Sequence, residues 1–171
     1  MRAFASIVFL GLSFILQSTL LSQFSVGGIV PNLLIITVAS IGFLIGRKYG
    51  LITGFTAGLL VDIFFGNVIG LYALLYMYVG YINGAFRKIL FPGDVKLPLA
   101  LIIGSDFVYG NLCYFFLFLF KGEFHYLYYL SKIIIPEVVY TTVVACIFFP
   151  LIKFVFRRIE LREEKALEES V

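Results

Sequence analysis

The sequence predicts an all-α integral membrane protein with six transmembrane helices and with both termini in the cytoplasm. Hydrophobic residues make up 61% of the 171 residues and charged residues 13%. A soluble domain of this length carries about a quarter charged residues, so the composition excludes that class. Long apolar runs recur along the chain, clusters of Lys and Arg separate them, and no hydrophilic stretch is long enough for a second domain.

The positions of the basic residues predict the orientation. With six spans and a cytoplasmic N-terminus, all but two of the 13 Lys and Arg residues face the cytoplasm, and only Lys121 and Lys132 lie outside. An imbalance of this kind in the loops sets the orientation of membrane proteins. Five helices would break the alternation, so the same pattern supports the helix number. The net charge of +3 fits loops that face anionic lipid and does not indicate nucleic-acid binding.

The first three predicted spans each carry a local signal. The first is too long for a signal peptide, lacks a small-x-small cleavage site and leads into further spans. The second begins at Pro31, because proline favours the first helical position. The third is short, with about 15 residues where about 20 are needed to cross a bilayer without tilt.

The last three spans are marked by prolines. Pro92, with Gly93 and Asp94, indicates a turn before the fifth span. Pro136 followed by Glu137 is typical of a new helix start, so the sixth span is predicted to begin there, after an outer interfacial segment. The approximate spans are 4–21, 31–45, 51–65, 70–86, 97–120 and 136–156, within a membrane domain of residues 1–156 that a charged cytoplasmic tail, 157–171, follows.

Glycines four residues apart run through the third span. Gly54 and Gly58 would let another helix approach closely, either a helix of the same bundle or a helix of a partner. Asp62 lies in the outer part of the same span. Because a carboxylate near the centre of a membrane helix costs at least ~2.5 kcal/mol, it must face water or protein. It is either solvated at the outer interface or directed at an outer cavity or a partner.

A second group of polar residues lies in the fifth and sixth spans. Asp106 is deep in the fifth span, and Asn111 follows about one turn later. They are interpreted either as a buried hydrogen-bonded pair or as a substrate or proton site. Glu137 either complements the dipole of a helix start or belongs to the same buried polar site.

Motifs for catalysis are not found in the sequence. The only histidine, His125, lies in a predicted outer loop, so a Ser-His dyad within the membrane is not available. Ser105 follows Gly104 but is not part of a nucleophile elbow. His, Cys and carboxylate residues do not cluster at metal-ligand spacing, and a phosphate-binding loop is missing. We therefore predict a protein that is not an enzyme and that has no metal and no cofactor.

Three segments carry the most specific pattern of the chain: residues 31–35 (PNLLI), 50–62 (GLITGFTAGLLVD) and 70–74 (GLYAL). This pattern resembles the rod-shape-determining membrane protein family MreD, as do the length, the short loops and the charged tail. Asn32 stands where the family more often has aspartate.

The resemblance implies a non-catalytic scaffold subunit of the bacterial elongation complex in the inner membrane. Such a subunit binds the bitopic protein MreC. With MreC, it helps to couple cytoplasmic MreB filaments to the glycosyltransferase RodA and its class B penicillin-binding partner, and so supports peptidoglycan synthesis and cell shape. The residues expected to form the surface for MreC are Asn32, Gly54, Gly58 and Asp62.

The resemblance also implies a bundle similar to the substrate-binding subunit, or S-component, of energy-coupling-factor vitamin transporters. This likeness supplies an alternative function. Such subunits usually present an Ala-x-x-x-Ala pattern on their first helix, whereas this first span has only Ser18-x-x-x-Ser22. The predicted outer loops are short, and tryptophan is absent from the sequence. These features favour the scaffold over the transporter subunit.

Overall fold

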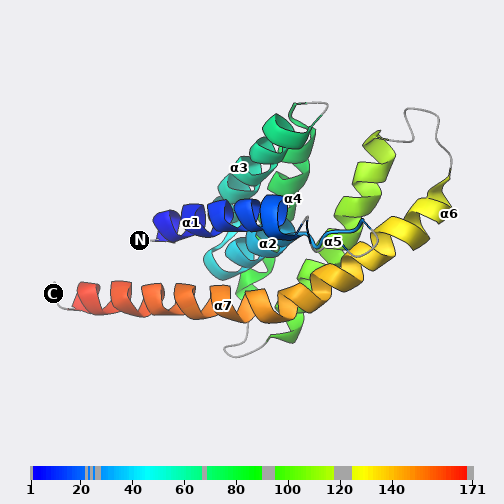
Figure 1. Cartoon of the computed structure of the whole chain (residues 1–171). Helices are drawn as coiled ribbons and strands as arrows, with labels where there is room; N and C mark the ends of the chain where they lie inside the picture. The colour runs from blue at the N-terminus through cyan, green and yellow to red at the C-terminus, as the bar shows by residue number, and fades with distance from the viewer. Residues whose placement is uncertain are drawn as a thin grey trace.

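The computed structural model describes residues 2–21, 23, 25, 28–66, 69–89, 95–117 and 125–168, which are arranged as a bundle of helices (Figure 1). The helical elements in chain order are α1 (Arg2–Ile15), the π-helix η1 (Leu16–Leu21), α2 (Leu33–Ile45), α3 (Arg47–Phe65), α4 (Leu71–Ala85), the 3-10 helix η2 (Phe86–Ile89), α5 (Lys96–Leu117), α6 (Tyr126–Tyr129), the π-helix η4 (Leu130–Ile134) and α7 (Ile135–Glu168). The turn predicted around Pro92 and the outer residue Lys121 lie outside the described residues.

Four of the helical segments are long and apolar enough to cross a membrane: Arg2–Thr19, Arg47–Phe65, Lys96–Leu117 and Tyr126–Ala166. The other two main helices are shorter, with 13 residues in α2 and 15 in α4. The chain is therefore an all-helical membrane protein. The total of six spans, and the side of the membrane on which the termini lie, stay predictions.

The third helix is longer than predicted. It has 19 residues and begins at Arg47, so it is not a short span. The sequence suggested a loop at Arg47 and Lys48 because charged residues usually end an apolar run. Only Gly46 separates α2 from α3, with a positive φ of 122° that a glycine adopts without strain. The reversal of the chain is thus tighter than the charge pattern suggested.

Helix α7 begins at Ile135, one residue from the predicted start at Pro136, but no break in the helical segment precedes it. Residues Tyr126–Ala166 form one continuous helical segment of 41 residues. Proline lacks the N–H group and its ring collides with the carbonyl four residues earlier. The π-helical turn η4 directly before Pro136 widens the backbone at this point and accommodates the ring. Glu137 accordingly lies inside a continuous helix, and the helix also continues through Pro150.

Helix α2 occupies the centre of the bundle. Every residue of α2 except Leu44 is buried, and it packs against α1, α3, α4, α5 and α7. A helix that is apolar all round, as this one is, is stable only when other apolar groups surround it. At 13 residues it spans roughly 20 Å, less than the hydrocarbon thickness of a bilayer, but neighbouring helices rather than lipid cover its ends.

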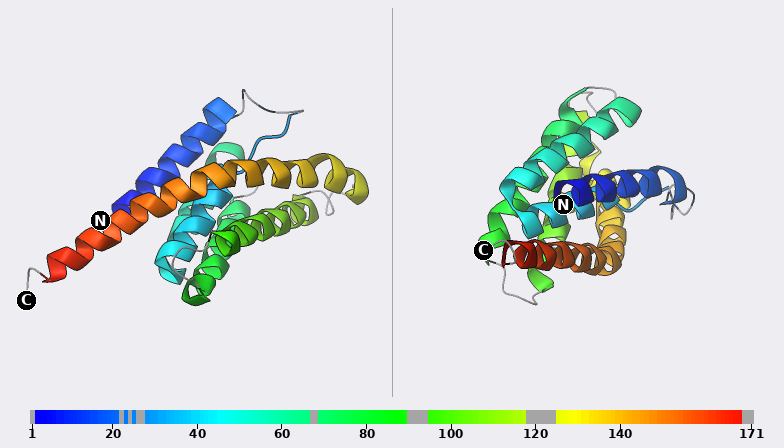
Figure 2. Two further views of the ribbon diagram at one scale, coloured as in Figure 1. Left: turned by 90° about the horizontal axis from the view of Figure 1, so that it is seen from below. Right: turned by 90° about the vertical axis from the view of Figure 1, so that its left-hand side faces the viewer.

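The first and the last helix meet at the end of the bundle where both termini lie. Helix α1 and the C-terminal part of α7 run alongside each other (Figure 2). The Arg2 guanidinium lies 2.6 Å from the Glu163 carboxylate and 3.7 Å from that of Glu160. The Arg87 guanidinium is also 3.7 Å from Glu160. The structure thus places the predicted charged tail beside two of the basic residues assigned to the same side of the membrane.

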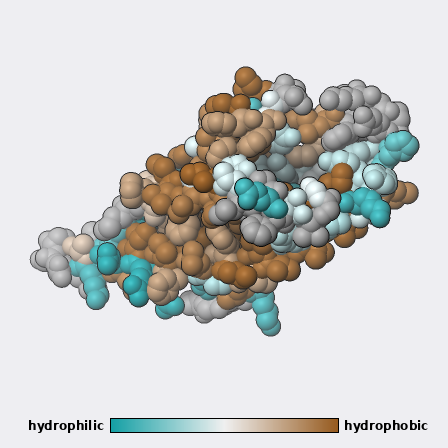
Figure 3. Space-filling model, in the orientation of Figure 1, coloured by the Kyte–Doolittle hydropathy of each residue, from teal (hydrophilic) through white to brown (hydrophobic). Residues whose placement is uncertain are grey.

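The surface of the bundle is largely apolar. On the face in Figure 3, hydrophobic side chains cover much of the molecule, and hydrophilic ones gather over the C-terminal part of α7 and toward the opposite, right-hand end. Large exposed hydrophobic side chains occur on helices α1, α3 and α7, including Phe4, Ile63 and Ile147. This distribution fits a molecule whose solvent is lipid rather than water.

Candidate functional site around helix α4

The Asp62 carboxylate caps the N-terminus of α4. Its Oδ2 atom accepts hydrogen bonds from the backbone N–H groups of Gly70, at 3.0 Å, and Ala73, at 2.9 Å. Its Oδ1 atom accepts a third, at 3.0 Å, from the N–H of Tyr72. The side chain is buried, with 1% of its surface exposed. A carboxylate at this place accepts hydrogen bonds from N–H groups that a helix start leaves without partners. Its negative charge also complements the helix dipole.

The glycines of α3 also face α4. A Cβ atom on Gly54 would lie 2.2 Å from the carbonyl oxygen of Tyr76, and one on Gly58 would lie 2.2 Å from that of Tyr72. No side chain fits at such distances. The close approach that the glycine spacing predicted is therefore the approach of two helices of the same chain.

Asn32 joins α2, α4 and α7. As the N-cap of α2, its Oδ1 atom accepts a hydrogen bond of 3.1 Å from the N–H of Ile35. The same oxygen accepts one of 3.0 Å from the Tyr76 hydroxyl on α4. Its backbone N–H donates to the Thr141 hydroxyl on α7, at 3.0 Å. These contacts need only an acceptor oxygen and a backbone N–H group. The neutral amide of Asn32 therefore makes them without the charge of the aspartate that the family more often has here.

The four residues predicted to bind a partner thus share one location in the structure, because each of them contacts α4. Asn32 and Asp62 bind its polar groups, and Gly54 and Gly58 lie against its backbone. All four are buried in the chain. Their direct contact with a partner stays a prediction, and what the geometry provides is a rigidly held α4.

Sequence reasoning missed Gly42 on α2. A Cβ atom on Gly42 would lie 2.4 Å from the carbonyl oxygen of Gly80, and one on Gly50 would lie 2.2 Å from the same oxygen. Three helix backbones therefore converge at Gly80. The spacing of the glycines could have indicated it. Gly42 stands four residues before Gly46, and Gly50 follows four residues after Gly46, so Gly42 belongs to the same series.

The second predicted polar group is only partly assembled. Asn111 does not pair with Asp106. It donates to the carbonyl of Phe107, and it accepts from the Tyr126 hydroxyl at 2.7 Å. Residues five positions apart on an α-helix point about 140° apart, so the two side chains leave α5 in different directions. Asp106 instead lies near Glu137 and Thr141 of α7.

Glu137 lines a cavity of about 330 Å³ next to α4. The cavity is also lined by Asn32, Tyr72, Tyr76 and Tyr109, and the rings of Tyr76 and Tyr109 lie 4.9 Å apart. Its lining residues include neither Lys nor Arg. The described residues hold no cluster of His, Cys and carboxylates that fits a metal ion. The arrangement offers hydroxyl groups and hydrogen-bond acceptors, which suit a polar ligand or bound water.

Asp106→Asn is expected to stabilise the protein. Asp106 is 2% exposed, and neither carboxylate oxygen has a hydrogen-bond partner among the described residues. The amide has the same shape without the acid group, so the free energy of unfolding should rise by about 1 kcal/mol. Thermal unfolding in nanodiscs measures the change, and Glu164→Gln on the exposed tail serves as the control. A clear loss of stability would mean that the carboxylate has a partner, such as bound water.

The fold and this site define a multi-helix membrane protein whose buried polar groups hold helices together. The sequence model described as rod shape-determining protein MreD matches residues 1–159. The chain therefore belongs to the MreD family. No curated protein and no solved structure matched the chain. The likeness to an S-component bundle stays a prediction.

Proposed function

We propose that this chain is a non-catalytic scaffold subunit of the bacterial elongation complex in the inner membrane. In this function it binds MreC and, through MreC, supports peptidoglycan synthesis by RodA and a class B penicillin-binding protein, with an indirect connection to MreB. The observation that carries the proposal is the family match over residues 1–159. The contacts of Asn32 and Asp62 support it, because these two side chains bind groups of α2 and α4 and so hold helices together.

The four predicted partner-binding residues act in this proposal by positioning α4. Asn32, Gly54, Gly58 and Asp62 fix this helix from one side. A helix held in this way presents a constant surface to a partner, which lowers the ordering cost of binding. We also propose that both termini are cytoplasmic, since Arg2 and Arg87 lie together with the charged end of α7.

Co-purification with MreC tests the proposed function. The tagged chain and MreC are co-expressed, extracted in mild detergent and transferred to nanodiscs, and the MreC recovered per chain is measured. We expect nearly stoichiometric recovery of MreC, and loss of recovery when the transmembrane helix of MreC is replaced by a polyleucine helix of equal length. Failure to recover MreC, or recovery from the native membrane of an ATPase pair with a coupling subunit instead, would overturn the proposal.

A further inference from the structure

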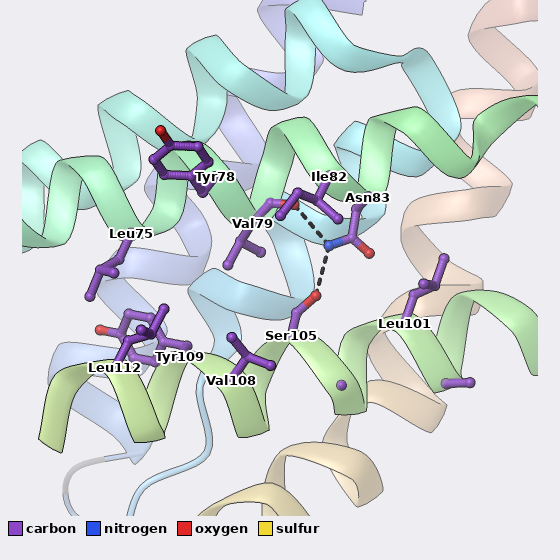
Figure 4. A pocket seen from close by; sticks show the side chains of 12 residues that line it. Leu75, Tyr78, Val79, Ile82, Asn83, Leu101, Ser105, Val108, Tyr109 and Leu112 are labelled. Carbon is purple, nitrogen blue, oxygen red and sulfur yellow. Dashed lines mark hydrogen bonds between the residues drawn. The ribbon is translucent and has the colours of Figure 1, made fainter. Parts of the chain in front are cut away.

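A groove runs between α4 and α5 on the side of α4 opposite to α3. It has a volume of about 290 Å³ and an almost entirely apolar wall. Figure 4 shows side chains from both helices along it, including Val79, Asn83, Leu101, Ser105 and Val108. Helix α4 thus has two different sides. One side packs closely against the glycines of α3, and the other borders an open groove.

One polar atom in this groove has no partner. The Nδ2 atom of Asn83 donates to the carbonyl of Val79, at 2.8 Å, and to the hydroxyl of Ser105, at 2.7 Å. Asn83 is 1% exposed, and its Oδ1 atom is a buried acceptor without a hydrogen bond in the described part of the chain. Figure 4 shows this oxygen directed toward the Leu101 end of the groove. An unpaired buried acceptor is unfavourable, and a donor in the groove would remove this cost.

The α5 wall provides a place for close approach. Gly104 lines the groove, and a Cβ atom on it would meet no heavy atom of the described residues within 4 Å. Ala100 lies four residues earlier on the same wall. Small residues at this spacing let a second helix pack backbone to backbone in lipid. Close packing against a helix backbone of the same chain already occurs at Gly54, Gly58 and Gly80. Gly104 has no such contact among the described residues.

We propose that the α4–α5 groove docks a single transmembrane helix of a partner protein. The docking face of that helix carries small residues opposite Gly104 and one hydroxyl or amide donor at the depth of Asn83. A lipid acyl chain has the apolar surface to fill the groove but has no donor for the Asn83 oxygen, so the unpaired acceptor favours a protein helix. The proposal rests on the proposed function, in which the bitopic protein MreC supplies this helix.

Gly104→Leu tests the groove directly. The leucine side chain enters open space, so the chain is expected to fold normally while the groove is filled. Gly11→Leu is the matched control, because Gly11 is also a helical glycine with nothing within 4 Å of its Cβ position, but it lies on α1. With MreC titrated in nanodiscs, Gly104→Leu should weaken binding more than about tenfold, equal to ~1.4 kcal/mol. Gly11→Leu should leave binding unchanged.

Photocrosslinking identifies the occupant. Benzoylphenylalanine replaces Val108, an exposed residue of the groove, or Val143, an exposed residue of α7, as the control. We expect adducts to the transmembrane helix of MreC from position 108 and not from position 143. Adducts to phospholipid alone from position 108, or unchanged MreC binding by Gly104→Leu, would overturn the groove proposal while the proposed function stands. If the unaltered chain does not bind MreC at all, the proposed function itself fails.

Discussion

Gly80→Ala is expected to destabilise the protein strongly. A Cβ atom on Gly80 would lie 1.9 Å from the carbonyl oxygen of Gly50, and both groups belong to helix backbones. A flexible side chain could move aside, but here α3 and α4 must separate as whole helices. The free energy of unfolding should fall by ~3 kcal/mol, the upper end of the range for overpacked sites. The thermal unfolding midpoint in nanodiscs and the amount of folded protein in the membrane measure the loss.

Gly104→Ala is the control for this substitution. Gly104 is a helical glycine of the same chain with open space at its Cβ position. Alanine is favoured over glycine in a helix by about 0.5–1 kcal/mol, so this variant should be as stable as the original or slightly more stable. Equal stability of Gly80→Ala and Gly104→Ala would show that α3 and α4 are not packed as closely as the structure has them.

Asp62→Ala is expected to be comparably damaging. The substitution removes the acceptor of three hydrogen bonds, from the backbone N–H groups of Gly70, Tyr72 and Ala73. The N–H group of Ala73 is left without this partner in a buried place, and those of Gly70 and Tyr72 in a partly buried one. Hydrogen bonds to a charged group contribute about 1.5–3 kcal/mol each, although such values are not additive. We expect a loss of about 3 kcal/mol or more in unfolding free energy, measured by thermal unfolding of the purified variant.

Asp62→Asn separates the capping interaction from the volume of the side chain. The amide keeps one acceptor oxygen but replaces the other by a donor, which faces backbone N–H groups. The stability should therefore lie between those of the original chain and Asp62→Ala. Glu164→Ala, on the exposed tail, should change little. An Asp62→Ala variant with unchanged stability would contradict the capping role and would favour a surface role for the carboxylate.

The positions of most helices were predictable from hydropathy, because the spacing of apolar runs depends only on local composition. The start of α3 was not predictable, since Arg47 and Lys48 have the composition of a loop but form the first helical turn. The continuity at Pro136 was hidden for a related reason. A proline followed by an acid is a local start signal, and the π-helical turn that overrides it is visible only in the backbone.

For the candidate site too, some features could be predicted from the sequence and others could not. The types of residue that matter could be predicted, because glycine and carboxylate in a membrane helix both demand an explanation. The sequence does not say whether Gly58 faces a helix of its own chain or that of another protein, since both give the same spacing. The failure of Asp106 and Asn111 to pair was predictable, because five residues do not complete an integral number of helical turns. The unpaired oxygen of Asn83 could not be predicted without coordinates.

The central position of α2 has a consequence for the order in which the protein is made. Helix α2 enters the membrane after α1 but before α4, α5 and α7, which later cover much of its surface. The hydroxyl groups of Ser13 on α1 and Thr37 on α2, 2.6 Å apart, need only the first two helices for their hydrogen bond. The nascent chain therefore has an early polar contact that pairs α1 with α2, whereas the ion pair between Arg2 and Glu163 cannot form until α7 has been made.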